Sequence, residues 1–379
     1  MNFTEKLGGL LPDGIDCFLV TSELNQRYLT GLNYTDGYVI VSREKSWLLA
    51  DFRYIEVAKR YETDTLEVVQ LENRKVNLGN IFADNKFSKV GFESNNMTVA
   101  RLNGLKETFP LVDFVPVGGI IEKMREIKTP EEVENTVRAQ RIAEKALDRL
   151  LALITPEMTE IDVALELEYG MRKFGAEKPA FDTIAISGTA TSMPHGVPRN
   201  VKLEKGFLTM DFGALYNGYC SDMTRTVVLG RADAEMKRLY NTVLEAQLAG
   251  LAYVEAGKTG ASCDKVARDI IDNAGYKGCF GHSLGHGVGM FIHEEPRLSA
   301  TFDKELPVGA IVTVEPGIYV EGKYGVRIED MVYLAESGPV NLTNAKRSLS
   351  SSSDERGGRE EERLLSLKER SKEAYKREV

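Results

Sequence analysis

The sequence predicts a mixed α/β protein, of the α+β type, built from two domains and a charged tail. The chain has 379 residues, which is more than one typical domain needs. Before Ile127, short apolar runs alternate with helical patterns, and after it longer helical patterns alternate with β-branched runs that contain acidic residues. We therefore expect domains over residues 1–126 and 127–345, followed by a tail over residues 346–379.

Five short runs in the first domain are expected to be strands, because they are rich in β-branched and aromatic residues. These runs cover residues 17–20, 38–41, 47–50, 66–69 and 89–92. Residues 54–60 and 98–109 have the pattern of helices. This alternation is typical of an α/β domain, and it contains no glycine-rich phosphate loop.

The second domain opens on a strong helix start. A short helix is expected over residues 121–127, and then Thr129 is followed by proline at the first helical position and by Glu132 at the third. A long amphipathic helix should follow to about Ala152. Further helices are expected over residues 159–174, 234–255 and 262–274.

Composition excludes several classes of function. Lys and Arg number 48 against 57 Asp and Glu, a net charge of −9, which argues against nucleic-acid binding. The sequence has no run of about 20 apolar residues that could span a membrane. Residues 1–7 lack the basic region and long apolar core of a secretion signal. Four scattered cysteines suggest reduced thiols and a cytoplasmic protein: Cys17, Cys220, Cys263 and Cys279.

All four histidines of the chain fall in two short stretches that look chemical. His195 lies in Met-Pro-His-Gly-Val-Pro, and His282, His286 and His293 lie within a glycine-rich segment. Histidine is a common metal ligand and titrates near neutrality. A single histidine more often packs or caps, but this clustering favours one functional site.

Two aspartates are expected to meet across a hairpin. Asp211 ends an apolar run, and Asp222 stands eleven residues later. Asn217-Gly218 between them is a strong turn signal. Antiparallel pairing about that turn brings the two carboxylates side by side.

Two glutamates also interrupt apolar, β-branched runs. Glu315 ends the run 311–314, and Glu329 lies in a fourth run that starts at Val326. Burying a carboxylate is costly unless it is paired, protonated or bound to metal. Arg225 and Arg327 are available as partners, so simple pairing is the alternative explanation.

The charges of these residues suit two divalent metal ions. Four carboxylates and one imidazole match hard to borderline ions, with Mn²⁺ expected first and Co²⁺, Zn²⁺ or Fe²⁺ as alternatives. Paired metals can activate water and stabilise the charge that develops at a carbonyl. The expected ligands are Asp211, Asp222, His286, Glu315 and Glu329.

These residues and their flanking strings resemble the pita-bread metallopeptidases, in particular the proline-specific branch. The strings DFG, SDMTRT, GHGVG, HEEP, VEPG and RIED occur in the family's order over residues 125–345. Residues 27–31 and 51–56 resemble the amino-terminal domain of the proline-specific members more weakly. The resemblance implies a creatinase-like amino-terminal domain, a pita-bread catalytic domain and a dinuclear metal centre held by the five residues.

The resemblance also implies roles for the remaining residues. His195 would contact the substrate near the scissile bond, and His293 would stabilise the intermediate or shuttle a proton. His282 would line the substrate pocket, one helical turn before His286 if that segment is helical. Arg327 would share a strand face with Glu329. Glu315 would act both as a ligand and as the group that takes and redelivers a proton.

The expected function is a metal-dependent exopeptidase that removes an amino-terminal residue preceding proline, an Xaa-Pro aminopeptidase. A dipeptidase (prolidase) is the alternative; it would need an extra arginine or a closing loop to hold the free carboxylate of a dipeptide. A non-catalytic binding protein is a further alternative, against which the intact ligand set argues. The resemblance also implies a homodimer.

The tail departs from the family pattern. A proline and a short apolar strand would follow residue 345, but a serine run and a lysine- and glutamate-rich stretch follow instead. We expect residues 346–379 to be disordered or a solvated helix, either native or the product of a shifted reading frame.

Overall fold

The computed structural model describes residues 2–347 and 349 of the chain. The chain divides into two compact units, Met1–Met124 and Arg125–Val379. Most of the predicted tail lies outside the described residues. In the part of the chain that is described, no helix is long and apolar enough to cross a membrane.

The amino-terminal unit is built on one six-stranded mixed sheet with the order β4-β3-β2-β1-β5-β6. β1, β2 and β3 pair antiparallel, whereas β4, β5 and β6 join in parallel. The first five strands confirm the predicted runs. The strands are β1 (Cys17–Val20), β2 (Tyr38–Ser42), β3 (Ser46–Ala50), β4 (Leu66–Gln70), β5 (Lys89–Glu93) and β6 (Asp113–Val117).

Several helices of this unit were not predicted. α2 and α4 contain asparagines, and α4 also contains a glycine; these residues are weak helix formers, so the pattern there is faint. β6 was missed as well, because Pro116 interrupts it; proline is tolerated there since β6 is an edge strand. The helices are α1 (Phe3–Gly9), α2 (Glu23–Thr30), α3 (Ile55–Ala58), the 3₁₀ turn η1 (Lys59–Tyr61), α4 (Arg74–Asp84) and α5 (Val99–Thr108).

The helices predicted for the second part of the chain are present. The Thr129 side chain accepts a hydrogen bond from the Glu132 N–H, and the Thr129 N–H donates to Glu132 Oε2 at 2.8 Å, which completes the capping box. The helices are α6 (Ile120–Glu126), α7 (Pro130–Leu153), α8 (Glu160–Lys173), α9 (Ala234–Tyr253), α10 (Gly260–Ile271) and the π-helical turn η3 (Asp272–Tyr276).

The strands described for the second unit form four small sheets with the orders β11-β10-β7, β12-β9-β8, β14-β13-β15-β18-β19 and β16-β17. They are β7 (Lys178–Pro179), β8 (Ile184–Ser187), β9 (Gly206–Phe212), β10 (Ala214–Tyr216), β11 (Tyr219–Cys220), β12 (Met223–Leu229), β13 (Gly285–Gly287), β14 (Glu294–Leu298), β15 (Ile311–Val314), β16 (Gly317–Val320), β17 (Tyr324–Arg327), β18 (Asp330–Ala335) and β19 (Gly338–Asn341). The 3₁₀ turn η2 (Gly188–Ser192) follows β8.

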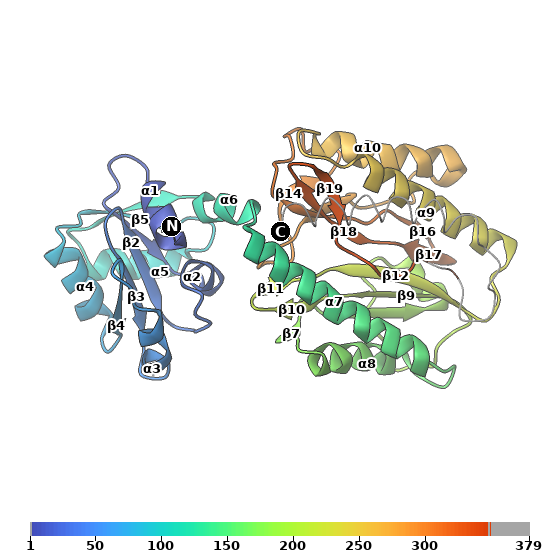
Figure 1. The fold of residues 1–379 in the computed structure, drawn as a ribbon, viewed down its shortest axis with the longest axis horizontal. Coiled ribbons are helices and arrows are strands. Elements are labelled where there is room, and N and C mark those ends of the chain that lie inside the picture. The colour runs from blue at the N-terminus through green and yellow to red at the C-terminus, as the bar shows by residue number, and fades with distance from the viewer. Residues whose placement is uncertain (1, 348, 350–379) are drawn as a thin grey trace. The chain divides into compact units, whose positions relative to one another are not determined.

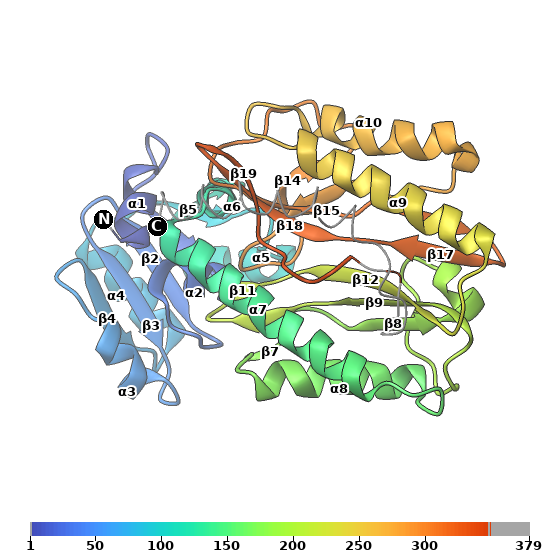
Figure 2. The ribbon, with the colours of Figure 1, turned by 45° about the vertical axis from the view of Figure 1, so that its right-hand side comes forward.

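The helix pairs bury separate cores against these strands. α7 and α8 pack with β9 and β12 around Leu167, Met210 and Phe212. α9 and α10 pack around Val243, Ala267 and Val312, which belong to another core cluster. In Figures 1 and 2 the strands run between the two pairs. The helices thus fix the sheets whose strand ends carry the predicted acids.

Candidate metal centre

The predicted hairpin brings the first two acids to one cavity. Asn217 and Gly218 have positive φ angles of 47° and 84°, as a two-residue primed turn requires, and the strands pair on either side of them. Asp211 lies in β9 directly opposite Thr224 of β12, and Asp222 lies just before that strand. Both aspartates line the same cavity.

His286 lies in a strand, β13, so the condition under which His282 would stand one helical turn before His286 is not met. The flanking glycines explain why. A Cβ atom on Gly285 would lie 2.0 Å from the Thr313 carbonyl oxygen, and one on Gly287 would lie 2.2 Å from the Glu295 carbonyl oxygen. Only glycine permits this close approach of neighbouring chains.

The two glutamates lie at strand ends. Glu315 directly follows β15, and Glu329 lies in the two-residue break between β17 and β18 rather than inside one continuous strand. Asp330, the first residue of β18, pairs with Arg225 at 2.7 Å and does not line the cavity. Both glutamate side chains line the cavity.

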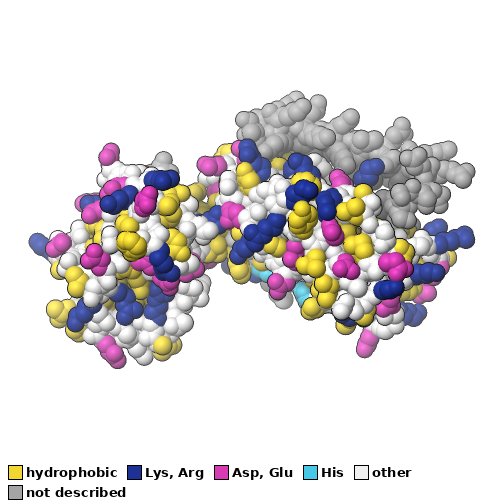
Figure 3. Space-filling model, turned by 90° about the horizontal axis from the view of Figure 1, so that it is seen from below, with side chains coloured by type: hydrophobic (Ala, Val, Ile, Leu, Met, Phe, Trp, Pro, Cys, Tyr) yellow, Lys and Arg dark blue, Asp and Glu magenta, His cyan; other side chains and the backbone are white. Residues whose placement is uncertain are grey.

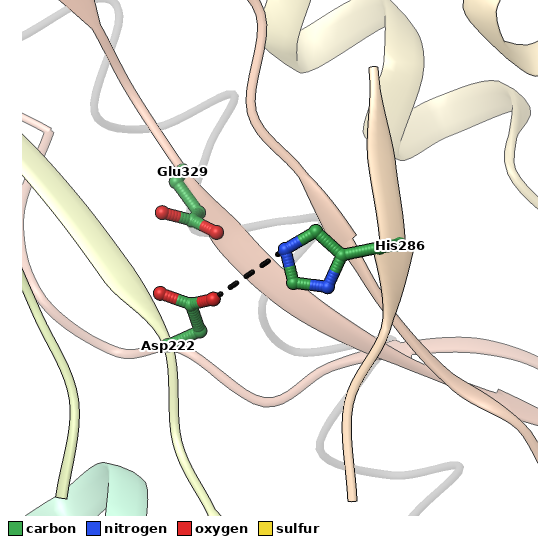
Figure 4. A group of neighbouring side chains, drawn as sticks. All are labelled: Asp222, His286 and Glu329. Carbon is green, nitrogen blue, oxygen red and sulfur yellow. Dashed lines mark ion pairs between the residues drawn. The ribbon is translucent and has the colours of Figure 1, made fainter. Parts of the chain in front are cut away.

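Three of the expected ligands form a tight group. Ligand atoms of Asp222, His286 and Glu329 all lie within 4.8 Å of one another, and their side chains point together in Figure 4. His286 Nε2 is 3.6 Å from Asp222 Oδ2 and 3.3 Å from Glu315 Oε1. The cavity has a volume of about 410 Å³. It is also lined by the other residues predicted for the site: His195, Asp211, His282, His293 and Arg327.

The donor set fits divalent cations. Asp211 Oδ1 and Glu329 Oε1 are buried and have no hydrogen-bond partner among the described residues. Burial first, and then repulsion from neighbouring carboxylates, raises the pKa of Asp222 and of Glu329 well above the usual range. Burial likewise raises the pKa of Glu315 to about 8. Ionised carboxylates are unfavourable in such a buried place unless a cation compensates their charge. Carboxylate oxygens together with one imidazole are a ligand set that suits divalent metal ions.

Two threonine hydroxyls orient the glutamates, and sequence reasoning missed both. Thr224 Oγ1 donates to Glu329 Oε2 at 2.7 Å. Thr313 Oγ1 donates to Glu315 Oε1 at 3.0 Å and accepts from the His286 N–H at 3.0 Å. Thr313 stands two residues before Glu315, and side chains two apart share a strand face. That spacing was a usable signal.

Arg327 links Asp211 to Tyr319, which in turn contacts His282. Its Nη2 donates to Asp211 Oδ2 at 2.7 Å, and its Nη1 donates to the Tyr319 hydroxyl at 2.8 Å and to the Pro194 carbonyl at 3.2 Å. The Tyr319 hydroxyl is also 2.8 Å from His282 Nε2. Tyr319 was not predicted. Asp211 thus has the arginine partner that the alternative of simple pairing requires, but only at Oδ2, since Oδ1 has no hydrogen-bond partner among the described residues.

Burial favours the neutral ring of His282, His286 and His293. Burial lowers the pKa of His286 to about 3 and that of His282 to about 4, and it also lowers the pKa of His293. The His286 and His293 rings meet edge to face with centroids 4.5 Å apart. Figure 3 shows histidine atoms at two neighbouring places on the surface. The site can therefore offer neutral imidazoles both to a metal and to a substrate.

Comparison with known proteins agrees with the strings and the fold. Residues 10–127 match the creatinase/prolidase N-terminal domain, and residues 134–336 match metallopeptidase family M24. A Xaa-Pro dipeptidase from Pyrococcus furiosus is 38% identical over 348 residues, which span 91% of this chain and 98% of that protein.

Two solved structures are similar along nearly their whole length. A Xaa-Pro dipeptidase from Bacillus anthracis has a TM-score of 0.88 and 40% identity, with 91% of this chain and 98% of that chain covered. An X-Pro aminopeptidase from Thermotoga maritima has a TM-score of 0.86 and 37% identity, with 90% and 99% covered. The predicted creatinase-like and pita-bread domains are confirmed, and the chain belongs to metallopeptidase family M24, a family of metal-dependent hydrolases.

Proposed function

We propose that the protein hydrolyses the bond between an amino-terminal residue and proline at a centre of two divalent metal ions. One observation carries the proposal: all nine residues predicted for the site line a single cavity. The similarity to a Xaa-Pro dipeptidase and an X-Pro aminopeptidase supports the proline specificity. Bound ions would supply Lewis-acid activation of a water and of the scissile carbonyl. The residues that would hold them are Asp211, Asp222, His286, Glu315 and Glu329.

The surroundings of Glu315 support a role in proton transfer. Its carboxylate is buried beside His286 and is oriented by the Thr313 hydroxyl. In the proposed reaction it takes a proton from the attacking water and returns it to the proline nitrogen. The neutral ring of His293 would donate a hydrogen bond to the carbonyl oxygen as negative charge develops there.

The cavity wall suits a proline ring. Phe181, Ile184, Ile292 and Pro194 provide apolar surface around the acids and histidines. An Xaa-Pro bond carries no N–H, and the ring fixes φ. A pocket that recognises the ring by apolar contact therefore does not depend on the amide donor that ordinary peptide substrates offer.

Arg297 bears on the length of the substrate, and it was not predicted. Its side chain lines the cavity with 39% of its surface exposed. Nη2 donates to the His293 carbonyl at 3.3 Å, and Nε lies 3.7 Å from Glu295 Oε1. A guanidinium at this place is the cation that a dipeptidase needs for the free carboxylate of its substrate. The sequence favours an aminopeptidase, whereas Arg297 favours the dipeptidase, and we propose a preference for Xaa-Pro dipeptides.

Kinetics decide between the two. We expect Ala-Pro to be cleaved with a higher kcat/KM than Ala-Pro-Ala in the presence of Mn²⁺, Co²⁺ or Zn²⁺. Arg297→Gln should raise the KM for Ala-Pro about 10- to 100-fold, the loss expected for a charged hydrogen bond, and change Ala-Pro-Ala little. An equal loss of kcat/KM for both peptides would favour the aminopeptidase over the dipeptidase. No hydrolysis by metal-loaded protein would favour a binding protein.

The remaining expectations concern the cell and the assembly. The homodimer rests on family resemblance, and the cytoplasmic location rests on cysteine usage; both stay predictions. Cys17, Cys220 and Cys263 are buried as free thiols, and Cys279 is partly buried. Sedimentation of the purified chain measures the first expectation directly.

A further inference from the structure

The three cavity histidines outside the ligand set lie on segments with little regular structure. His195 follows the η2 turn, His282 precedes β13, and His293 directly precedes β14. A ladder of backbone hydrogen bonds therefore does not fix these rings. Rate depends steeply on the placement of such groups, and a shift of about 1 Å can cost roughly 100-fold. Each segment is instead tied by a buried carboxylate.

Glu160 closes the base of the segment that carries His195. Its side chain is completely buried. Oε1 accepts from the Ser187 N–H at 2.8 Å and from Arg199 Nη2 at 2.7 Å, and Oε2 accepts from the Arg199 N–H at 2.9 Å and from Nε at 2.8 Å. Ser187 ends β8, and Arg199 follows the segment, so one carboxylate holds both ends. At the tip, Pro194 is held by Arg327.

Asp264 and Arg268 hold the segment that carries His282. Asp264 accepts from Arg268 Nε at 2.7 Å and from the Leu284 N–H at 3.0 Å. Arg268 in turn donates to the Phe280 carbonyl at 2.7 Å and to the His282 carbonyl at 2.8 Å. The pair on α10 is thus hydrogen-bonded to the backbone before His282, at His282 and after it.

Glu294 holds the turn that carries His293. Its carboxylate pairs with Arg125, and Lys128 Nζ lies 3.4 Å from Oε2. Oε1 also accepts from the Phe291 N–H at 2.8 Å. Glu294, Arg125 and Lys128 are all buried. Glu294, the residue next to His293, is therefore held in place by its ion pairs with two cations that do not line the cavity.

We infer that these three buried carboxylates, with their cations, are positioning devices for the three substrate-side histidines. We call them the Glu160–Arg199, Asp264–Arg268 and Glu294 braces. Among the described residues that line the cavity, none belongs to a brace. The three carboxylates are buried, whereas Arg199 and Arg268 are 40% and 29% exposed, and only the cations of Glu294 are buried with it. Exposed pairs are screened by water, and buried pairs lose their attraction to the cost of desolvation, so neither kind contributes much to stability. Because each brace is bonded to the backbone of a different histidine segment, orientation explains the three of them better.

The chain offers a direct readout, because it has only four histidines. Zinc-loaded full-length protein labelled with ¹³Cε1-histidine should give four ring signals, assignable from His195→Gln, His282→Gln and His293→Gln. Arg199→Lys, which keeps the charge but loses the two-pronged geometry, should shift or broaden the His195 signal alone. Arg268→Lys should do so for His282, and His286 should be unchanged in both Arg→Lys variants. Glu294→Gln should act on His293, and because that ring contacts the His286 ring, a smaller shift of the His286 signal is expected in this variant only.

The kinetic part of the inference rests on the proposed function. Each brace variant should lose about 10- to 100-fold in kcat/KM for an Xaa-Pro substrate while its metal content stays that of the wild type. Lys265→Gln is the matched control: Lys265 neighbours Asp264 on α10, pairs with Asp269 at 2.8 Å, and is 72% exposed. It should leave both the four signals and the kinetics unchanged.

Two results would overturn the inference. One is a set of brace variants that melt earlier but leave their own histidine signal in place. The other is a variant that moves all four signals together, which indicates general loosening. Should Glu294→Gln fail to fold, since Arg125 and Lys128 would then face a neutral amide, the two Arg→Lys variants decide. If the wild type cleaves no Xaa-Pro peptide, the proposed function fails, and the ring signals still test the braces.

Discussion

The expected metal ligands and the three substrate-side histidines line one cavity, but the fold holds them in different ways. The ligands lie on strands or at strand ends, where ladders and threonine hydroxyls such as that of Thr313 orient them. The histidines lie on irregular segments and depend on charged pairs that stand outside the cavity, such as Glu160 with Arg199. A rigid sheet suits groups that must hold a fixed coordination geometry. Separately braced segments let each substrate contact be set without disturbing the centre.

The largest effect is expected on the ligand side, at Glu315. Glu315→Gln keeps the size and one acceptor oxygen, but it removes the charge and the ability to accept a proton. We expect a folded protein with weakened metal binding and turnover lowered by about 10²–10⁴-fold, the usual contribution of general acid–base catalysis. Steady-state kinetics at saturating metal measure it. Near-normal turnover would remove both the ligand role and the proton-transfer role from this residue.

The expected metal ligands can be predicted from the sequence, whereas most of the side chains that orient them cannot. Asp211 and Glu315 stand out because an acid that interrupts an apolar run needs a reason to be buried. Thr313 has the spacing that places it on the strand face of Glu315, but the sequence does not show that its hydroxyl reaches that acid. Arg297 looks like any surface arginine, and only its neighbours in space show that it lines the cavity. The same limit applies across the fold: strands formed by runs rich in β-branched and aromatic residues were predicted, whereas the asparagine-containing α4 was not.

The three braces could not be predicted from the sequence, for a simple physical reason. Glu160 and Arg199 are distant in sequence, as are Arg125 and Glu294, and no local pattern marks charges that meet only after folding. Asp264 and Arg268 stand four residues apart, a spacing at which side chains meet on the surface of one helix, so this pair alone could be expected from the sequence. Even there, the sequence does not show that the pair reaches the His282 backbone.

Metal removal should make stability depend on pH. Burial raises the folded pKa of Glu315 to about 8, above its ordinary value of 4.5, so the folded state keeps a proton that the unfolded chain releases. The stabilisation is full below about pH 4.5 and is lost as the pH rises through 8, because the free energy of unfolding falls by about 1.4 kcal/mol for each pH unit between these values. The raised pKa values of Asp222 and Glu329 act in the same direction.

The histidines act in the opposite direction at lower pH. The folded pKa values of His282 and His286 are about 4 and 3, below the ordinary 6.5, so their contribution is complete above pH 6.5. Between pH 7 and 8.5 the contribution of these histidines is already complete, so the raised pKa values of the acids should make the melting temperature of chelator-treated protein fall. Loading with Mn²⁺ should flatten that slope, and Glu315→Gln should reduce it. A melting temperature that rises over this interval would contradict the raised pKa of the centre.

On the histidine side, turnover and metal content should separate. We expect His293→Ala to lower kcat about 10²–10³-fold, the usual cost of losing one donor to a developing oxyanion. Its metal content should stay near normal, because the ring packs against His286 but is not among the expected ligands. His195→Ala should likewise keep its metal and lose turnover. Loss of metal from either variant would mean that the two groups of residues are not held independently.

The smallest effect should come from a hydroxyl that belongs wholly to the ligand side. Thr313→Val keeps the β-branched shape but removes the hydroxyl between the His286 N–H and Glu315 Oε1. Groups that orient ligands typically affect metal affinity about 10- to 100-fold. We therefore expect weaker metal binding by that factor in a metal titration, with turnover restored at saturating metal and all substrate-side histidine signals unmoved.

Thr226→Val is the control for this prediction. The Thr226 hydroxyl, on β12, donates to the Arg327 carbonyl rather than to an expected ligand, so the metal affinity of this variant should stay closer to that of the wild type. Equal losses in the two variants would show that the sheet itself, rather than the Thr313 hydroxyl, orients Glu315.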